Sequence, residues 1–321
     1  MLLFLLDLMR TEGLFSSCEN SKDMMFFNGG SIMKILITGA SGFIGRNLEE
    51  NWSNKYNIYC PKRSELNLLN TENVEKYLAK NQFDVVIHAA NTNNTRNIAT
   101  TNYESLDGNL RMFLNLERCK NSYGKMYYLG SGAEYDMAHY IPNMKEDYFG
   151  MHVPSDSYGF SKYIMSRMCD RSENIYDLRL FGVYGKYEEW ERRFISNAIC
   201  RALKGKDIIL HQNVYFDYLW IEDLCDILEW FVANRPKYHH YNVCRGTKIG
   251  LYSLAEMVRE ILNVDCDIIV EKQGWKAEYT GNNERLMKEL GDYTFTGFKE
   301  SVAKLCDFYR KNMEMIDDVK L

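Results

Sequence analysis

The sequence has no block of like charge, no basic tract and no long apolar run. Its 39 lysines and arginines and 44 aspartates and glutamates are dispersed, for a formal net charge of −5. Proteins that bind nucleic acid or anionic membranes usually concentrate positive charge, so we expect neither partner. No segment is apolar for long enough to span a bilayer, since the apolar start MLLFLLDLMR is short and contains Asp7.

The nine cysteines form neither C-x-x-C pairs nor a cluster with the spacing of metal ligands. An odd, scattered set indicates reduced, mostly buried thiols, so we expect a cytoplasmic protein without a metal site. The N-terminal stretch lacks the basic region and the cleavage site of a signal peptide. We expect residues 1–32 to be an extension outside the fold, and Met33 to stand directly before the first strand.

Apolar runs alternate with amphipathic stretches up to about residue 187. Strands are expected at 34–39, 57–61, 84–90, 125–130 and 176–185, and helices at 46–52, 72–80 (capped by Thr71), 106–119 and from about 158. This alternation is typical of an α/β fold with a Rossmann-like doubly wound parallel sheet. We place that domain at 33–186, with sheet contributions from about 205–244. A smaller C-terminal α/β lobe is expected at 187–321.

The stretch KILITGASGFIGRNL carries three glycines at intervals of three, Gly39, Gly42 and Gly45, between a strand and a helix. In a dinucleotide-binding loop, such glycines permit a tight turn, a close approach of the backbone to a pyrophosphate and close packing of the helix. A plain strand-to-helix turn is the alternative. The position first in the sheet favours dinucleotide binding.

The end of the second expected strand reads CPKRSELN. NAD-binding sites usually place an acidic residue there to bind the ribose 2′-hydroxyl. Lys62 and Arg63 stand there instead and suit a 2′-phosphate, so we expect NADP, with NAD still possible. A solvated turn rich in cations remains the alternative.

Tyr158 and Lys162 are four residues apart in YGFSKY, which places both on one face of a helix. A lysine charge beside a phenol stabilises its phenolate, so Tyr158 can exchange a proton near neutral pH. Ser131, at the end of the strand in YLGSGAEYD, could hold the substrate oxygen that Tyr158 protonates. A serine that bonds only its own turn is the alternative.

Taken together, TGASGFIG, the HAA at 88–90, Ser131 and Y-x-x-x-K resemble the extended short-chain dehydrogenase/reductase family. This NAD-dependent epimerase/dehydratase family contains nucleotide-sugar epimerases, dehydratases and 4-keto reductases. The segments KRSELNLLNTENVEKYLAKNQFDVVIHAA and YYLGSGAEYD are similar to its NADP-dependent GDP-fucose synthase branch. The resemblance implies that 33–186 binds NAD(P), that the C-terminal lobe binds a nucleotide sugar, and that the protein is a homodimer formed through a helix pair.

The resemblance also assigns the site. It implies Ser131, Tyr158 and Lys162 as the catalytic residues, and a structural role for His88. The residues expected at the cofactor are Gly39, Ser41, Gly42, Phe43, Ile44, Gly45, Arg63, Leu68, Ala89, Ala90, Tyr158, Lys162 and Phe181.

Three departures from the family pattern narrow the expected reaction. The GDP-fucose synthases epimerise with a cysteine and a histidine, and the matching positions here are Ala133 and, approximately, Tyr187. The 4,6-dehydratases have Asp-Glu where this chain has Gly132 and Ala133. Reduction of a 4-keto sugar nucleotide needs only Ser131, Tyr158 and Lys162.

Two other functions remain open from the sequence. The first is a nucleotide-sugar 4-epimerase with a tightly bound cofactor. The second, of another class, is a non-catalytic NAD(P)-binding scaffold, which would be expected to have lost part of the Ser–Tyr–Lys set. The asparagine-rich loop at 91–97 either lines the sugar site or is a solvent loop.

Overall fold

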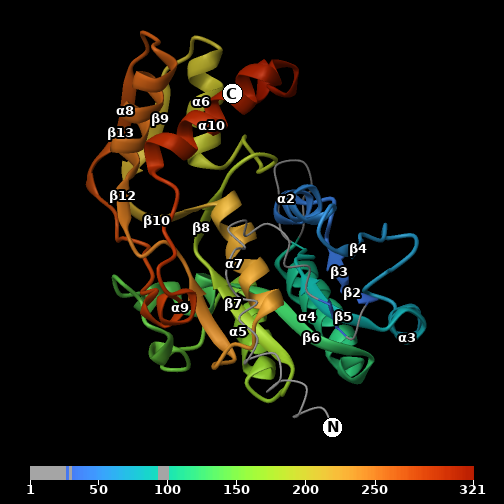
Figure 1. Cartoon of the computed structure of the whole chain (residues 1–321). Helices are drawn as coiled ribbons and strands as arrows, with labels where there is room; N and C mark the ends of the chain where they lie inside the picture. Colours follow the sequence, from blue (N-terminus) through green and yellow to red (C-terminus); the bar gives the residue numbers. More distant parts are fainter. Residues whose placement is uncertain (1–26, 29–30, 93–100) are drawn as a thin grey trace, which may run out of the picture.

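The structure is a computed structural model, and it describes residues 27–28, 31–92 and 101–321 (Figure 1). Its main sheet has six parallel strands in the order β11-β7-β6-β5-β3-β4. These strands are β3 (Lys34–Thr38), β4 (Asn57–Tyr59), β5 (Phe83–His88), β6 (Tyr123–Ser131), β7 (Ile175–Leu180) and β11 (His240–Val243). Every residue of β7 is buried, as expected for a central parallel strand that is covered on both faces.

Helices cover both faces of this sheet. One face carries α2 (Phe43–Trp52) and α7 (Ile221–Ala233), which pack against each other. The other carries α3 (Thr71–Asn81), α4 (Asn102–Arg118) and α5 (Ser157–Cys169). In the sheet, β4 lies on one side of β3 and β5 lies on the other. The carboxyl end of β3 is therefore at the switch point where α/β proteins bind ligands. The expected doubly wound α/β fold is confirmed.

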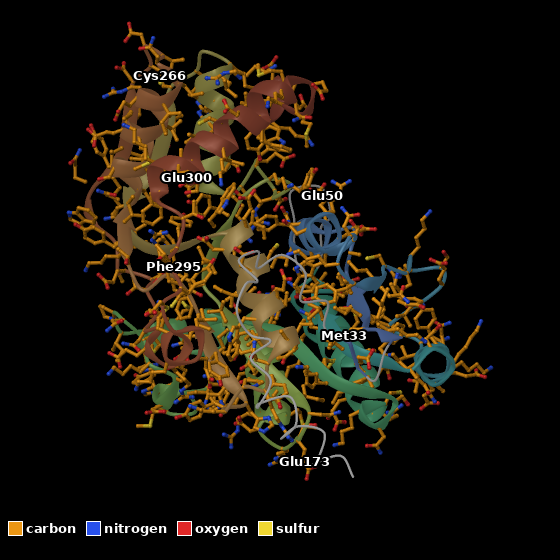
Figure 2. The ribbon with its side chains drawn as sticks, in the orientation of Figure 1. Met33, Glu50, Glu173, Cys266, Phe295 and Glu300 are labelled. Carbon is orange, nitrogen blue, oxygen red and sulfur yellow. The ribbon has the colours of Figure 1, made fainter. Side chains whose placement is uncertain are left out.

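The rest of the chain forms smaller sheets with their own helices. The sheet β12-β10-β8 contains β8 (Gly182–Tyr184), β10 (Tyr215–Trp220) and β12 (Lys248–Gly250), and β9 (Ile208–Asn213) pairs in parallel with β13 (Ile268–Trp275). The helices are α6 (Phe194–Leu203), α8 (Leu251–Leu262), α9 (Glu284–Leu290) and α10 (Phe298–Lys311). Figure 1 shows α6, α8 and α10 together at one end of the molecule. Figure 2 places Glu300 of α10 there, far from Met33 beside the sheet.

The remaining elements are short. The strands β1 (Phe27–Asn28) and β2 (Ser31–Ile32) pair antiparallel. Single 3₁₀ turns occur at η1 (Lys120–Ser122), η2 (Gly132–Glu134), η3 (Met137–His139), η4 (Glu146–Tyr148), η5 (Met313–Met315) and η6 (Asp318–Lys320). Most of the expected N-terminal extension and most of the loop 91–97 lie outside the described residues.

Two local expectations were wrong. The single strand expected at 176–185 is broken at Phe181: β7 stays in the main sheet, while β8 pairs with β10. A Cβ on Gly182 would lie 2.8 Å from the backbone carbonyl oxygen of Asp217, so glycine allows β8 to approach β10 closely there. Helix α3 is capped by Asn70, whose side chain accepts the Asn73 N–H at 2.9 Å, while the Thr71 hydroxyl donates to Asn115.

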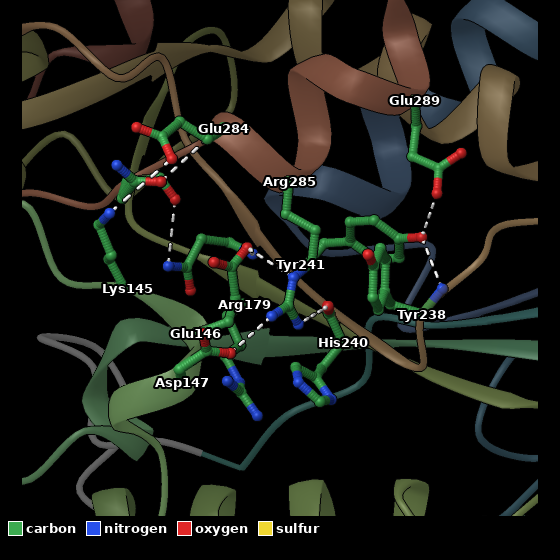
Figure 3. A network of polar contacts seen from close by, with 12 residues as sticks. Lys145, Glu146, Asp147, Arg179, Tyr238, His240, Tyr241, Glu284, Arg285 and Glu289 are labelled. Atoms are coloured by element: carbon green, nitrogen blue, oxygen red, sulfur yellow. Dashed lines mark hydrogen bonds and ion pairs between the residues drawn. The ribbon is translucent and has the colours of Figure 1, made fainter.

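Arg285 of α9 ties the C-terminal part to the segment after β6. Its guanidinium donates to an Asp147 carboxylate oxygen at 2.8 Å and to the His240 carbonyl at 3.3 Å, and lies 4.0 Å from Glu146 (Figure 3). Nearby, the Tyr241 hydroxyl donates to Glu289 at 2.8 Å. These contacts fix α9 against the edge of the sheet that β11 forms.

Candidate active site

The turn between β3 and α2 is packed too closely for side chains. Gly39 has a φ of +71°, and a Cβ there would lie 2.7 Å from the Cα of Ala90. A Cβ on Gly45 would lie 2.5 Å from the Cα of Ala40. Glycine is therefore required at both positions, because Ala90 after β5 leaves no room at Gly39 and the turn residue Ala40 leaves none at Gly45.

The same turn leaves the start of α2 open. Gly42 is the N-cap residue, no side chain of the described residues caps the helix, and the first turn carries no acidic residue. Ser41 and Gly42 are exposed, and Phe43 and Ile44 are partly buried behind them. Free backbone N–H groups at the positive end of a helix dipole suit a phosphate, so these residues fit a dinucleotide.

His88 is buried at the end of β5, next to this turn. Its Nδ1 lies 2.9 Å from the Thr38 hydroxyl oxygen, which also accepts the Ala90 N–H at 3.3 Å. Burial lowers the pKa of His88 to about 3, and the charge of Lys162 adds to this. The imidazole is therefore neutral and bonded to the end of β3, and its expected structural role stays a prediction.

Lys62 and Arg63 lie in an exposed turn after β4. The Lys62 N–H donates to a Glu65 carboxylate oxygen at 2.8 Å, which fixes the turn. Within the described chain, neither cationic side chain has a partner. Leu68 is buried beneath the sheet edge, in the cluster that contains Val74.

Tyr158 and Lys162 come together at the start of α5, whose N-cap Asp156 accepts the Gly159 N–H at 2.8 Å. The Lys162 side chain is buried, and its Nζ donates to the Leu129 carbonyl of β6 at 3.0 Å. That Nζ lies 5.8 Å from the centre of the Tyr158 ring and 4.7 Å from that of Tyr128. The ammonium is thus held between β6 and the partly exposed Tyr158.

Ser131 is the last residue of β6 and the N-cap of the short turn η2. Its Oγ accepts the Ala133 N–H at 3.1 Å, and its own N–H donates to Glu134 at 2.9 Å. The bond to its own turn, considered above as an alternative role, is therefore present.

A buried ionic network lies beneath Ser131. The Nε of Arg179 donates to Glu134 and to Asp177, at 2.9 Å in each case, and all three side chains are fully buried. Burial and the neighbouring Asp177 charge raise the pKa of Glu134 well above its usual range. The Ser166 hydroxyl donates to Asp177 at 2.6 Å and so fixes the network to α5.

Tyr279 was not predicted as a site residue. Its backbone pairs with β10, donating to the Tyr215 carbonyl at 2.9 Å and accepting the Asp217 N–H at 3.1 Å. Its ring centre lies 5.3 Å from that of Phe181, and its Cζ is 2.9 Å from the position of a Cβ on Gly132. No local pattern distinguishes this tyrosine from the other 22, since only the fold brings it beside Gly132.

Ser131 ends β6, Lys162 binds the Leu129 carbonyl two residues earlier on that strand, and Tyr158 lies beside Lys162. Phe181 lies beside Gly132, and the glycine turn lies next to Ala90. The structure does not bring Tyr187 to this group, because the Tyr187 hydroxyl donates to Glu50 of α2 at 2.6 Å. Among the described residues, no group of three or more His, Cys, Asp or Glu side chains could hold a metal ion. In the same part of the chain, no helix is both long and apolar enough to span a bilayer.

Three features define a Rossmann-type enzyme that uses a nucleotide cofactor. They are the parallel doubly wound sheet, the glycine turn at its switch point before a helix without a side-chain cap, and the Tyr–Lys pair beside it. The chain belongs to the NAD dependent epimerase/dehydratase family, whose model matches residues 35–244. This confirms the resemblance to the extended short-chain dehydrogenases/reductases.

Relatives match over almost their whole length. GDP-L-colitose synthase of Yersinia pseudotuberculosis is 23% identical over 86% of this chain and 98% of its own. GDP-6-deoxy-D-talose 4-dehydrogenase of Aggregatibacter actinomycetemcomitans is 23% identical over 85% and 97%. The structure of a GDP-mannoheptose C4 reductase from Campylobacter jejuni with NADP bound has a TM-score of 0.75 and 20% identity, over 87% and 98%.

Proposed function

We propose that this protein is an NADP-dependent nucleotide-sugar oxidoreductase that reduces the C4 ketone of a 4-keto (deoxy)sugar nucleotide. The observation that carries the proposal is the convergence of Ser131, Tyr158 and Lys162 at the carboxyl end of β6. It is supported by two relatives whose names specify chemistry at C4, a C4 reductase and a 4-dehydrogenase.

NADPH, when bound, supplies the hydride. Ser131 then holds the substrate oxygen through its hydroxyl, and Tyr158 donates the proton to that oxygen. Lys162 stabilises the phenolate left on Tyr158, since a buried ammonium close to a phenol favours its ionised form. Placing donors in advance at an oxygen that gains negative charge is worth about 3–4 kcal/mol per donor in enzymes that rely on it.

The cofactor is proposed to contact the residues expected from the sequence. The glycine turn would bind the pyrophosphate, Arg63 the 2′-phosphate, and Ala89, Ala90 and Phe181 would flank the rest. NADP is preferred to NAD because two cations and no free acid stand after β4: Glu65 already accepts the Lys62 N–H.

The wider organisation is also proposed. Residues 33–186 bind the cofactor and 187–321 the nucleotide sugar. The protein is a cytoplasmic homodimer through α4 and α5, which pack side by side and expose Tyr103, Leu114 and Phe160. The cytoplasmic location is supported by free thiols at all cysteines of the described chain, of which only Cys60 is not buried.

The proposal is tested with a panel of nucleotide-4-keto-6-deoxy sugars, each with NADPH and with NADH. GDP-6-deoxy-talose with NADP⁺ tests the reverse reaction. We expect stoichiometric loss of the NADPH absorbance with one ketone, and a slower reaction with NADH.

Two results would contradict this reduction. Interconversion of two sugars without a net change in NADPH absorbance would indicate a 4-epimerase. Tight NADPH binding without turnover of any sugar would indicate a scaffold.

A further inference from the structure

Glu134 is a fully buried carboxyl group that takes no part in the proposed reaction, yet it binds the backbone of Ser131. Its Oε1 accepts the Ser131 N–H at 2.9 Å. In the same turn the Ala133 N–H donates to the Ser131 Oγ at 3.1 Å, so the two bonds form a capping box. The backbone and the side chain of Ser131 are therefore both held by the turn that follows it.

The other oxygen of Glu134 is held by Arg179. The Arg179 Nε donates to Glu134 Oε2 and to Asp177 Oδ2, at 2.9 Å in each case. Its two terminal nitrogens donate to the hydroxyls of Tyr135 and Ser166, also at 2.9 Å each. Since all three nitrogens of this planar group are bonded, Arg179 holds Glu134 in one orientation.

The same network joins the end of β6 to α5, the helix that carries Tyr158 and Lys162. Ser166 lies one turn after Lys162 on this helix, and its hydroxyl accepts from Arg179 and donates to Asp177 at 2.6 Å. A buried ionic network adds little net stability, and its best-supported role is to specify one arrangement of the groups around it. Here it fixes the end of β6 relative to the first turns of α5.

Glu134 and Asp177 lie close together over Gly130. A Cβ on Gly130 would overlap with both Glu134 Oε1 and Asp177 Oδ1. Apart from Glu134, no group of the described residues bonds to Asp177 Oδ1. Burial and the Asp177 charge raise the pKa of Glu134 well above its usual range. A proton on Glu134 relieves the repulsion between the two oxygens, and the carboxyl group still accepts the Ser131 N–H.

We propose that Glu134 is a positioning residue, which fixes Ser131 through its backbone N–H so that the serine hydroxyl meets the substrate oxygen. This inference rests on the proposed function. Glu134 has no exposed surface through which it could touch the sugar or the cofactor, so it acts only through Ser131. The site thereby extends to the buried network around Arg179.

The substitution Glu134→Gln tests this role, because it keeps the size of the side chain. An amide has one accepting oxygen, so glutamine can accept from Ser131 or from Arg179, but not from both. Its nitrogen turns towards Asp177 Oδ1, which leaves the Ser131 N–H without an acceptor. On whichever ketone of the panel turns over, kcat should fall about tenfold or more, while KM for the sugar and Kd for NADPH stay within about twofold.

A double-mutant cycle with Ser131→Ala separates positioning from general damage to the fold. In the Ser131→Ala background the hydroxyl is already gone, so Glu134→Gln should lower kcat by less than about twofold. A loss of equal size in both backgrounds would show that Glu134 does not act through the serine hydroxyl and would overturn the inference. Wild-type kcat in the single variant Glu134→Gln would overturn it as well.

Glu146→Gln is the matched control. Glu146 is also a buried carboxyl group that accepts a backbone N–H, from Asn242 at 3.0 Å, and it lies 4.0 Å from the Arg285 guanidinium. The same substitution there changes no bond of Ser131, so kcat should stay within about twofold of the wild type. A loss as large as that in Glu134→Gln would assign both losses to the fold and contradict the proposal.

The bond is also measured without turnover, by the exchange of the Ser131 amide proton with solvent in protein with isotope-labelled serine. The Ser131 signal is the one missing from Ser131→Ala. Glu134→Gln should speed its exchange at least about tenfold and leave that of Ser301 unchanged, because the Ser301 N–H donates to the Gly297 carbonyl in α10. Unchanged exchange at Ser131 would overturn the inference. If the wild type fails on every sugar of the panel while this exchange is faster, the proposed function and the role of Glu134 in it are refuted, and the bond stands.

Discussion

At the scale of the residue, Lys162 carries a charge into a site where it is only 4% exposed. Its Nζ is bound by a backbone carbonyl and flanked by two tyrosine rings. Burying an ammonium without a carboxylate partner costs free energy, so such an arrangement usually serves the chemistry of a site. In the proposed reaction, this charge lies beside the phenol of Tyr158.

Arg63 is predicted to select the cofactor. Replacing it by alanine removes a charged hydrogen bond to a 2′-phosphate, worth about 1.5–3 kcal/mol, so KM for NADPH should rise roughly tenfold or more. KM for NADH should stay unchanged, because NADH has no such phosphate. Initial-rate kinetics with both cofactors measure this, and Arg118→Ala, also an exposed arginine, is the control. Equal effects on both cofactors would contradict the role.

The site was only partly predictable from single residues. Ser131, Tyr158 and Lys162 could be named because a strand end and an i, i+4 spacing place them locally. Tyr279 could not, because it lies far along the chain, and neither could the buried hydrogen bond from Arg179 to Glu134. Such contacts depend on how distant segments pack, about which local patterns carry no information.

At the scale of the element, the first β-α-β unit was the most predictable part. Apolar runs fix β3 and β5, and the glycines fix the turn between β3 and α2. The cap of α3 was misassigned by one residue, because Asn70 and Thr71 are both good N-cap residues and only the geometry selects between them. The break between β7 and β8 was missed because Phe181 and Gly182 continue the apolar pattern, although the chain changes sheets there.

Gly45 is predicted to position the start of α2, where the pyrophosphate would bind. Replacing it by alanine forces α2 away from the turn, since the new Cβ would lie 2.5 Å from the Cα of Ala40. Overpacking of this kind costs about 1–3 kcal/mol of folding free energy, and NADPH affinity should fall at least about tenfold as the helix start shifts. Fluorescence titration with NADPH measures the affinity.

Gly297→Ala is the control for this variant, because a Cβ on Gly297 meets nothing within 4 Å and its φ is −62°. It should leave NADPH affinity unchanged. Unchanged affinity in the Gly45→Ala variant as well would contradict the assigned site.

At the scale of the whole molecule, the C-terminal part reaches back to the sheet at several points. Arg285 binds Asp147 beside β11, and the Tyr279 ring lies over Gly132, directly after β6. The glycine turn and the end of β6 thus belong to one packed body. In the proposed function, the cofactor and the sugar would be held between the sheet and the C-terminal elements. This arrangement was only coarsely visible in the sequence, where the alternation of elements loosens after residue 187.

We expect Glu188 to make the free energy of unfolding depend on pH, and Glu188→Gln to remove this dependence. Burial raises the pKa of this carboxyl to about 7, although the Ser196 hydroxyl donates to it. The unfolded pKa is near 4.3, so the folded state holds this proton longer, and stability is lost as pH rises from about 4.5 through 7. Glu188→Gln should therefore be more stable than the wild type at pH 8, by up to about 3 kcal/mol, and similar at pH 4.5.

Urea unfolding at the two pH values measures this difference. Glu173→Gln, at an exposed position labelled in Figure 2, should show no such dependence. An advantage of Glu188→Gln that is equal at both pH values would show that the carboxyl does not titrate as assigned.

The most direct test of the account is turnover and cofactor binding in Tyr158→Phe, measured on the same preparation. The substitution removes only the phenolic oxygen, and the ring above Lys162 remains. The account predicts that sugar reduction falls by at least about a hundredfold, since a proton donor in the transition state is worth 10²–10⁴-fold, while the Kd for NADPH stays within about twofold. A Tyr158→Phe variant that reduces its sugar at the wild-type rate would contradict the central claim.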